Sequence, residues 1–103
     1  MPAGLIGGPM PKRHPVLTLS EVNAIVANLG FKFKRKEGAH AQWECEADGT
    51  HPRSVITVDD GEREFDEFLI KSMIRQSKRT REEFYGATKR TAKRAGVPHL
   101  EKS

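Results

Sequence analysis

The chain has 103 residues, of which 36% are hydrophobic and 31% are charged, which is enough apolar material for one small domain. It contains no run of ten apolar residues, so we expect a cytoplasmic protein without a membrane-spanning segment. The single cysteine, Cys45, excludes an internal disulfide framework and a zinc site built from cysteines.

The net charge of +4 is unevenly distributed along the chain. Residues 44–67 hold nine acidic residues and two arginines, whereas residues 71–94 hold nine basic residues and two glutamates. A third, short block at 32–36 is also basic. Segregated positive charge favours a polyanion partner such as RNA, because each neutralised phosphate releases counterions. A solvated face with a basic tail is the plainer alternative, and the acidic middle could also meet a basic patch on another copy or on a partner protein.

The predicted elements begin after a leader. Residues 1–15 hold four of the six prolines, so we expect residues 1–16 to be disordered. Thr18 and Glu21 have the spacing of a capping box, and apolar residues at helical spacing follow up to Gly30. This pattern predicts a helix over about 18–29, ended by the glycine.

Three strands are predicted next. Residues 31–36 and 40–46 alternate at period two, with a turn at 37–39 between them, and residues 53–58 are rich in β-branched side chains. The turn residues of 47–52 separate the second strand from the third, and Asp59-Asp60-Gly61 ends the third.

Two helices complete the pattern. The first is predicted over about 66–77, and the second over about 81–95, opened by a second capping box at Thr80 and Glu83 and ended by Gly96. The order of elements predicts an α+β domain in which helices lie on one face of a three-stranded antiparallel sheet. Residues 87–103 form a basic extension that we expect to be partly helical or disordered.

Strand parity predicts which side chains share a face. If Phe31, Phe33, Trp43 and Ile56 face the helices, the opposite parity exposes a histidine beside a row of lysines on the open face: His40, Gln42, Lys32, Lys34 and Lys36. A histidine can take the proton of a ribose 2′-hydroxyl, and cations can stabilise the pentavalent phosphate that follows. This route needs no metal or cofactor, and we expect none.

Each of these residues also has an ordinary interpretation. His40 alone is an unremarkable histidine on a wet strand edge, and lysines on a solvent-facing strand are common. The other three histidines, His14, His51 and His99, lie in proline-flanked loops and are expected to be solvated.

The segment Gly38-Ala39-His40-Ala41-Gln42-Trp43, after a basic strand and the Leu29-Gly30-Phe31 helix end, resembles the Gly-x-His-x-x-aromatic signature of HicA-type toxins, the YcfA-like family. The segments 70–76 and 80–84 resemble the closing helix and terminal turn of the same family. The likeness covers about residues 18–86, so we delimit a HicA-like domain at 17–86.

The resemblance implies a fold like a double-stranded-RNA-binding domain, α-β-β-β-α, with a short additional C-terminal helix here. It implies a metal-independent endoribonuclease, an mRNA interferase that a HicB-like antitoxin neutralises by covering the active site. His40 would be the catalytic residue, and Lys32, Lys34, Lys36 and Gly38 would be the RNA-binding candidates. The alternative is a non-catalytic RNA-binding or protein-interaction module on the same fold, in which the basic region 71–94 supplies the affinity. The acidic loop 59–67 and the helix after it could form a dimer or antitoxin surface, which is compatible with either function.

Overall fold

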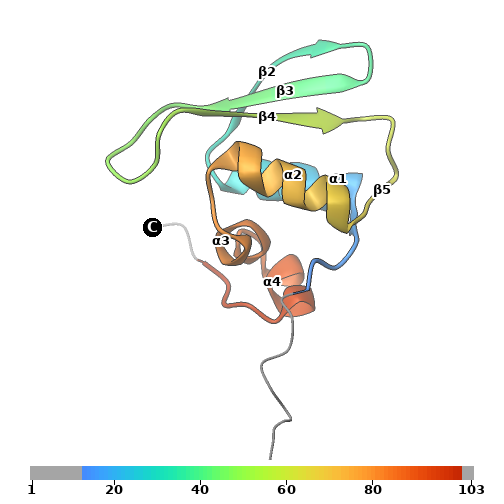
Figure 1. Ribbon diagram of the computed structural model, residues 1–103, viewed down its shortest axis with the longest axis vertical. Coiled ribbons are helices and arrows are strands. Elements are labelled where there is room, and N and C mark those ends of the chain that lie inside the picture. Colours follow the sequence, from blue (N-terminus) through green and yellow to red (C-terminus); the bar gives the residue numbers. More distant parts are fainter. Residues whose placement is uncertain (1–12, 101–103) are drawn as a thin grey trace, which may run out of the picture.

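The structure, a computed structural model, describes residues 13–100 and has the α+β class predicted from the sequence (Figure 1). Residues 1–12, which hold most of the predicted disordered leader, and residues 101–103 lie outside the described part. The elements in chain order are β1 (Leu17–Thr18), α1 (Leu19–Asn28), β2 (Lys32–Glu37), β3 (His40–Cys45), β4 (Ser54–Asp59), β5 (Glu64–Phe65), α2 (Glu67–Ser77), α3 (Arg81–Gly86) and α4 (Lys89–Ala95).

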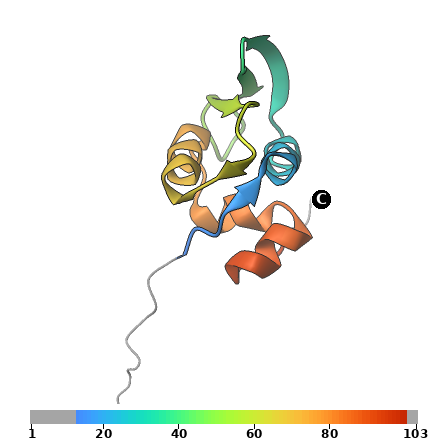
Figure 2. The ribbon, with the colours of Figure 1, turned by 90° about the vertical axis from the view of Figure 1, so that its right-hand side faces the viewer.

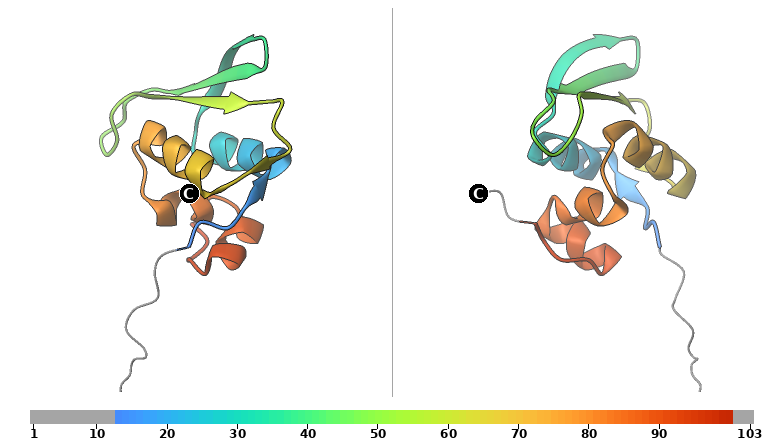
Figure 3. Two further views of the ribbon diagram at one scale, coloured as in Figure 1. Left: turned by 45° about the vertical axis from the view of Figure 1, so that its right-hand side comes forward. Right: turned by 60° about the vertical axis from the view of Figure 1, so that its left-hand side comes forward.

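The elements form three layers. The antiparallel sheet has the order β2-β3-β4, and α1 and α2 lie side by side beneath one of its faces (Figures 1 and 2). The short helices α3 and α4 pack below them, which leaves the other face of the sheet free of helices (Figure 3). The core lies between the layers and is formed by buried apolar side chains that include Val22, Ile25, Ile56, Val58, Ile70 and Phe84. Removing these side chains from water is the main source of stability.

Both predicted capping boxes are present. The Glu21 amide donates to the Thr18 hydroxyl at 3.2 Å, and the Thr18 amide donates to the Glu21 carboxylate at 3.0 Å. The same reciprocal pair joins Thr80 and Glu83, at 3.0 Å and 2.9 Å. Because these bonds satisfy amides that have no partner within the helix, they fix where α1 and α3 begin.

The predicted single helix over 81–95 is wrong, because the chain breaks at Ala87–Thr88 into α3 and α4. Thr88 is extended (φ −127°, ψ 152°) and its hydroxyl accepts the Thr91 amide at 3.1 Å, so it starts a new helix. The break lets the chain fold back over Gly86, where an added Cβ would lie 2.6 Å from the Pro98 carbonyl oxygen. Gly86 is therefore needed for this close approach.

The segment before α1 is held by the C-terminal layer. β1 pairs with β5 in a two-stranded sheet that the sequence pattern did not predict. The Tyr85 hydroxyl, on α3, donates to the Pro15 carbonyl at 2.7 Å, and the His14 ring lies edge-on to the Tyr85 ring with centroids 6.3 Å apart. The chain from His14 onward is thus part of the folded domain.

One carboxylate joins the first helix to the last. The Glu21 carboxylate, in a residue that is 9% exposed, accepts hydrogen bonds from both terminal nitrogens of Arg94, at 2.7 Å and 2.5 Å. The Arg94 hydrogen bonds hold the pKa of Glu21 below its ordinary value of 4.5, against the opposing effect of burial. This bidentate pair ties α4 to the start of α1.

We predict that Glu21→Gln lowers the free energy of unfolding by about 1–3 kcal/mol at pH 7, because it removes the charge while keeping a capping amide. Urea denaturation measures the change, and Ser20→Ala, at the neighbouring exposed position, should change it by less than about 0.5 kcal/mol. Since the folded pKa of Glu21 is depressed, its contribution is complete above pH 4.5 and disappears as the pH falls through the folded pKa. The difference in the free energy of unfolding between wild type and Glu21→Gln should therefore become smaller on acidification. A constant difference from pH 7 to pH 3 would contradict this.

Candidate nucleic-acid interface

His40 lies where the β2–β3 hairpin turns into the central strand of the sheet. The turn needs Gly38, whose φ of +60° is in the left-handed region. His40 is exposed and is paired with Glu37 on β2 and Asp59 on β4. The Asp60 amide donates to the Ala39 carbonyl at 2.7 Å, so the loop after β4 is attached to the hairpin turn beside His40.

A β-bulge between Phe33 and Arg35 changes the predicted pattern of faces. Phe33 pairs with Trp43, but the next paired positions are Arg35 with Gln42 and Lys36 with Ala41, which leaves Lys34 as the extra residue. Side chains paired across strands share a face. Arg35 therefore lies on the open face with Gln42, and Lys36 lies on the helix-side face with Ala41. The prediction that Lys36 shares the open face with His40 is wrong for this reason.

Phe33 lies on the helix-side face, as predicted, but it is not part of the buried core. Phe33 is 51% exposed, whereas Phe31, just before the strand, is 3% exposed. Phe33 has the parity of the helix-side face, but β2 is an edge strand and every one of its residues is exposed. Its ring meets Trp43 edge-on, with centroids 5.8 Å apart.

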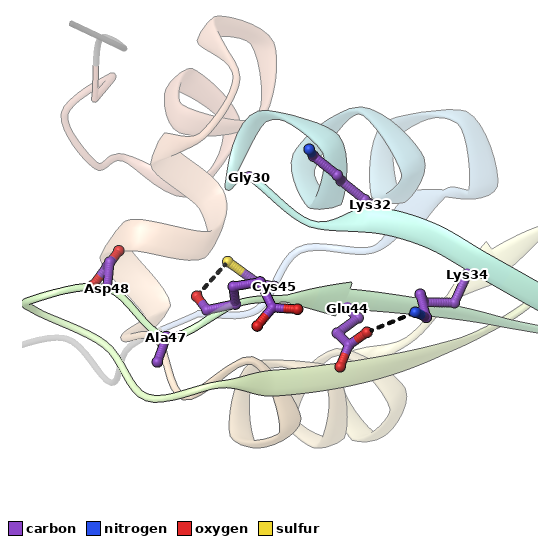
Figure 4. A pocket seen from close by; sticks show the side chains of 8 residues that line it. Gly30, Lys32, Lys34, Glu44, Cys45, Ala47 and Asp48 are labelled. Atoms are coloured by element: carbon purple, nitrogen blue, oxygen red, sulfur yellow. Dashed lines mark hydrogen bonds and ion pairs between the residues drawn. The ribbon is translucent and has the colours of Figure 1, made fainter.

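The cations of this region are engaged by carboxylates. Lys34 Nζ lies 3.2 Å from Glu44, Lys36 Nζ lies 3.0 Å from Asp60, and an Arg35 terminal nitrogen lies 3.6 Å from Glu37. Arg53, just before β4, forms a second ion pair with Glu44. The acidic segment after β4 is thereby partly neutralised by Lys36, and the basic residues are held in defined positions. Among the predicted RNA-binding lysines, Lys32 points away from Glu44 (Figure 4).

The open face of the sheet carries a shallow hollow of about 170 Å³. Its lining consists of three cations, one carboxylate, one amide and one aliphatic side chain: Lys34, Arg35, Arg53, Glu44, Gln42 and Val55. Glu44 is 9% exposed, and hydrogen bonds from Lys34 and Arg53 hold its pKa below the ordinary value of 4.5. Sequence reasoning missed Arg35 and Arg53, because only the bulge and the β3–β4 register bring them together.

A larger hollow of about 490 Å³ lies between the start of β2 and the segment after β3 (Figure 4). Its lining includes two lysines, Lys32 and Lys34, and three carboxylates, Glu44, Glu46 and Asp48. The excess of negative charge disfavours a phosphate there. Within residues 13–100, no group of three or more His, Cys, Asp or Glu side chains is arranged to hold a metal ion.

Two histidines that were expected to be solvated are engaged instead. His51 Nε2 lies 3.2 Å from a Glu83 carboxylate oxygen, which joins the β3–β4 loop to α3. The His14 side chain is only 11% exposed. Their sequence contexts gave no signal for these contacts, which link residues far apart in the chain. His99 is exposed, as predicted.

The basic region 71–94 is partly structural. Four of its nine cations have partners inside the domain: Lys71 with Glu67, Arg94 with Glu21, Arg79 over the Phe31 ring and Arg81 over the Tyr85 ring. These contacts use charge that the sequence pattern alone would assign to a binding surface.

The chain matches no protein-family model, no curated protein and no solved structure. Among the described residues, no helix is long and apolar enough to cross a membrane.

We predict that Gly38→Ala lowers the free energy of unfolding by about 1 kcal/mol, because an alanine is strained at φ +60° although nothing lies within 4 Å of its Cβ. Gly49→Ala is the matched control, since its site is equally open and its φ lies outside the left-handed region. Urea denaturation of both variants gives the comparison. Equal effects of the two substitutions would show that the hairpin turn does not depend on the Gly38 conformation.

Proposed function

We propose that this protein is a HicA-like toxin, a metal-independent endoribonuclease that acts on mRNA in the cytoplasm and is neutralised by a HicB-like antitoxin. The observation that carries the proposal is the exposed imidazole of His40 at the start of the central strand, on the same open face as the cations of Lys34 and Arg35. The Gly-x-His-x-x-aromatic segment around it supports the same family.

The proposed chemistry needs only these side chains and water. His40 removes the proton of a ribose 2′-hydroxyl, and the resulting oxygen attacks the adjacent phosphorus. The bond from phosphorus to the 5′-oxygen breaks, and that oxygen takes a proton from water. The hydroxide that remains takes the proton from the His40 imidazolium, which restores the neutral imidazole and the water molecule. The products are a 2′,3′-cyclic phosphate and a 5′-hydroxyl end. The cations of the open face bind the backbone of the same RNA strand and hold it across the sheet beside His40.

The arrangement of the first five larger elements supports a fold like a double-stranded-RNA-binding domain. The succession α1, β2, β3, β4, α2 matches α-β-β-β-α, with both helices on one face of the sheet (Figure 1). In this proposal, α3 and α4 are an addition to that domain, and the open face is the surface that an antitoxin would cover.

A non-catalytic RNA-binding or protein-interaction module is the second candidate. The observation that favours it is the acidic surroundings of His40, which is paired with Glu37 and Asp59 and lies next to the loop that carries Asp60. Carboxylates this close repel a phosphate that approaches the imidazole.

Cleavage of a long single-stranded RNA in the presence of EDTA separates the two candidates. We predict that wild type cleaves and leaves 2′,3′-cyclic phosphate ends, and that His40→Ala lowers the rate by about 10²–10⁴-fold, the range typical of a lost general base. His99→Ala is the matched control, because His99 is also exposed but lies in the C-terminal segment.

The same RNA made with 2′-deoxyribose should not be cleaved, since it lacks the attacking hydroxyl. If wild type and His40→Ala both shift the RNA in a salt-dependent way and neither cleaves it, the protein is a binding module and the enzymatic proposal is wrong.

A further inference from the structure

We infer that Arg53, Lys34 and Arg35 form a subsite for an RNA backbone phosphate, separate from the phosphate that His40 would act on. This inference rests on the proposed function, because it assigns the path of the RNA strand across the open face. The three cations come from β2 and from the residue before β4, and they surround one hollow with Gln42 and Glu44.

The distance between Glu44 and His40 excludes a direct catalytic role for the two cations that Glu44 binds, Lys34 and Arg53. Gln42 and Glu44 follow His40 on the same face of β3, two and four residues along the strand. At about 3.3 Å per residue, these positions lie roughly 7 Å and 13 Å from His40. A proton relay needs contact within about 3 Å, or one intervening water. The Glu44 carboxylate and its cations therefore act on a different part of the substrate.

The charge of the hollow suits a phosphate. Three cations against the single Glu44 carboxylate leave an excess of two positive charges within the lining, and an excess of one when Glu37, the partner of Arg35, is included. Glu44 is shared by Lys34 and Arg53 and holds the two side chains on either side of it. A guanidinium has five donors, so Arg53 keeps donors for a phosphate while it is bound to Glu44. Arg53 and Arg35 are 60% and 64% exposed, and are thus accessible from solvent.

Removing the charge of Glu44 and removing the charge of Arg53 should change the RNA affinity in opposite directions. Glu44 positions the two cations but also competes with a phosphate for them. If the hollow binds RNA, removing the carboxylate charge should strengthen binding, whereas removing the Arg53 charge should weaken it. A purely structural ion-pair cluster would give weaker or unchanged binding in both cases.

The test measures binding of a fluorescein-labelled single-stranded oligouridine by fluorescence anisotropy, between 50 and 200 mM salt. The protein carries His40→Ala throughout, so that cleavage does not interfere. Adding Arg53→Gln should make the negative slope of log K against log salt shallower by about 0.7, the value for one phosphate contact on a single strand. Adding Glu44→Gln should tighten binding at every salt concentration.

Arg90→Gln is the matched control, because Arg90 is an exposed arginine on α4, away from the sheet. It should leave the slope unchanged. Circular dichroism and urea denaturation of each variant ensure that only folded protein is compared.

The subsite is wrong if folded Arg53→Gln leaves the slope of log K against log salt unchanged. It is also wrong if Glu44→Gln does not tighten RNA binding. A lower slope with Arg90→Gln alone would place the RNA on α4 and overturn it as well. The cleavage assay on the wild-type protein distinguishes failure of the subsite from failure of the proposed function. If wild type cleaves RNA but Arg53→Gln does not change the salt slope, the subsite is wrong and the endoribonuclease proposal stands. Absence of any RNA binding would refute both.

Discussion

A single extra residue in β2 decides which side chains lie beside His40. Up to Phe33 the strand keeps the parity predicted from its sequence, and after the bulge at Lys34 that parity is reversed. The reversal puts Arg35 on the open face with Gln42 and turns Lys36 toward Asp60 on the other side. Because side chains alternate strictly along a strand, one inserted residue exchanges the two faces for everything that follows. This irregularity therefore decides that Arg35, and not Lys36, lies on the open face.

The same cations also explain how an acidic segment can lie next to a basic strand. The sequence separates the charges into blocks, but the fold brings the blocks together as pairs, such as Lys34 with Glu44 and Lys36 with Asp60. Exposed pairs of this kind contribute little to stability. Their effect is on position, since each carboxylate holds a long side chain in one place and reduces the net field around the site.

The sequence predicted the elements better than it predicted their side-chain partners. A capping box, helical spacing of apolar residues and strand patterns predicted α1, α2 and the three long strands to within one or two residues, because these signals are local. The bulge at Lys34 and the burial of His14 depend on contacts between distant segments, so no local pattern indicated them. The break at Thr88 did have a local signal, because a threonine can cap the start of a new helix. For the candidate site, His40 and Lys34 were found from parity, whereas Arg35 and Arg53 required the strand register.

The proposed site requires that RNA binds across the open face of the sheet. Nuclear magnetic resonance of the ¹⁵N-labelled protein, titrated with a 2′-O-methyl RNA that cannot be cleaved, tests it most directly. We expect the backbone amide signals of residues 34–44 and 53–57 to shift as the RNA binds, while those of α4 stay in place. Shifts confined to α3 and α4, with the strands unaffected, would contradict it.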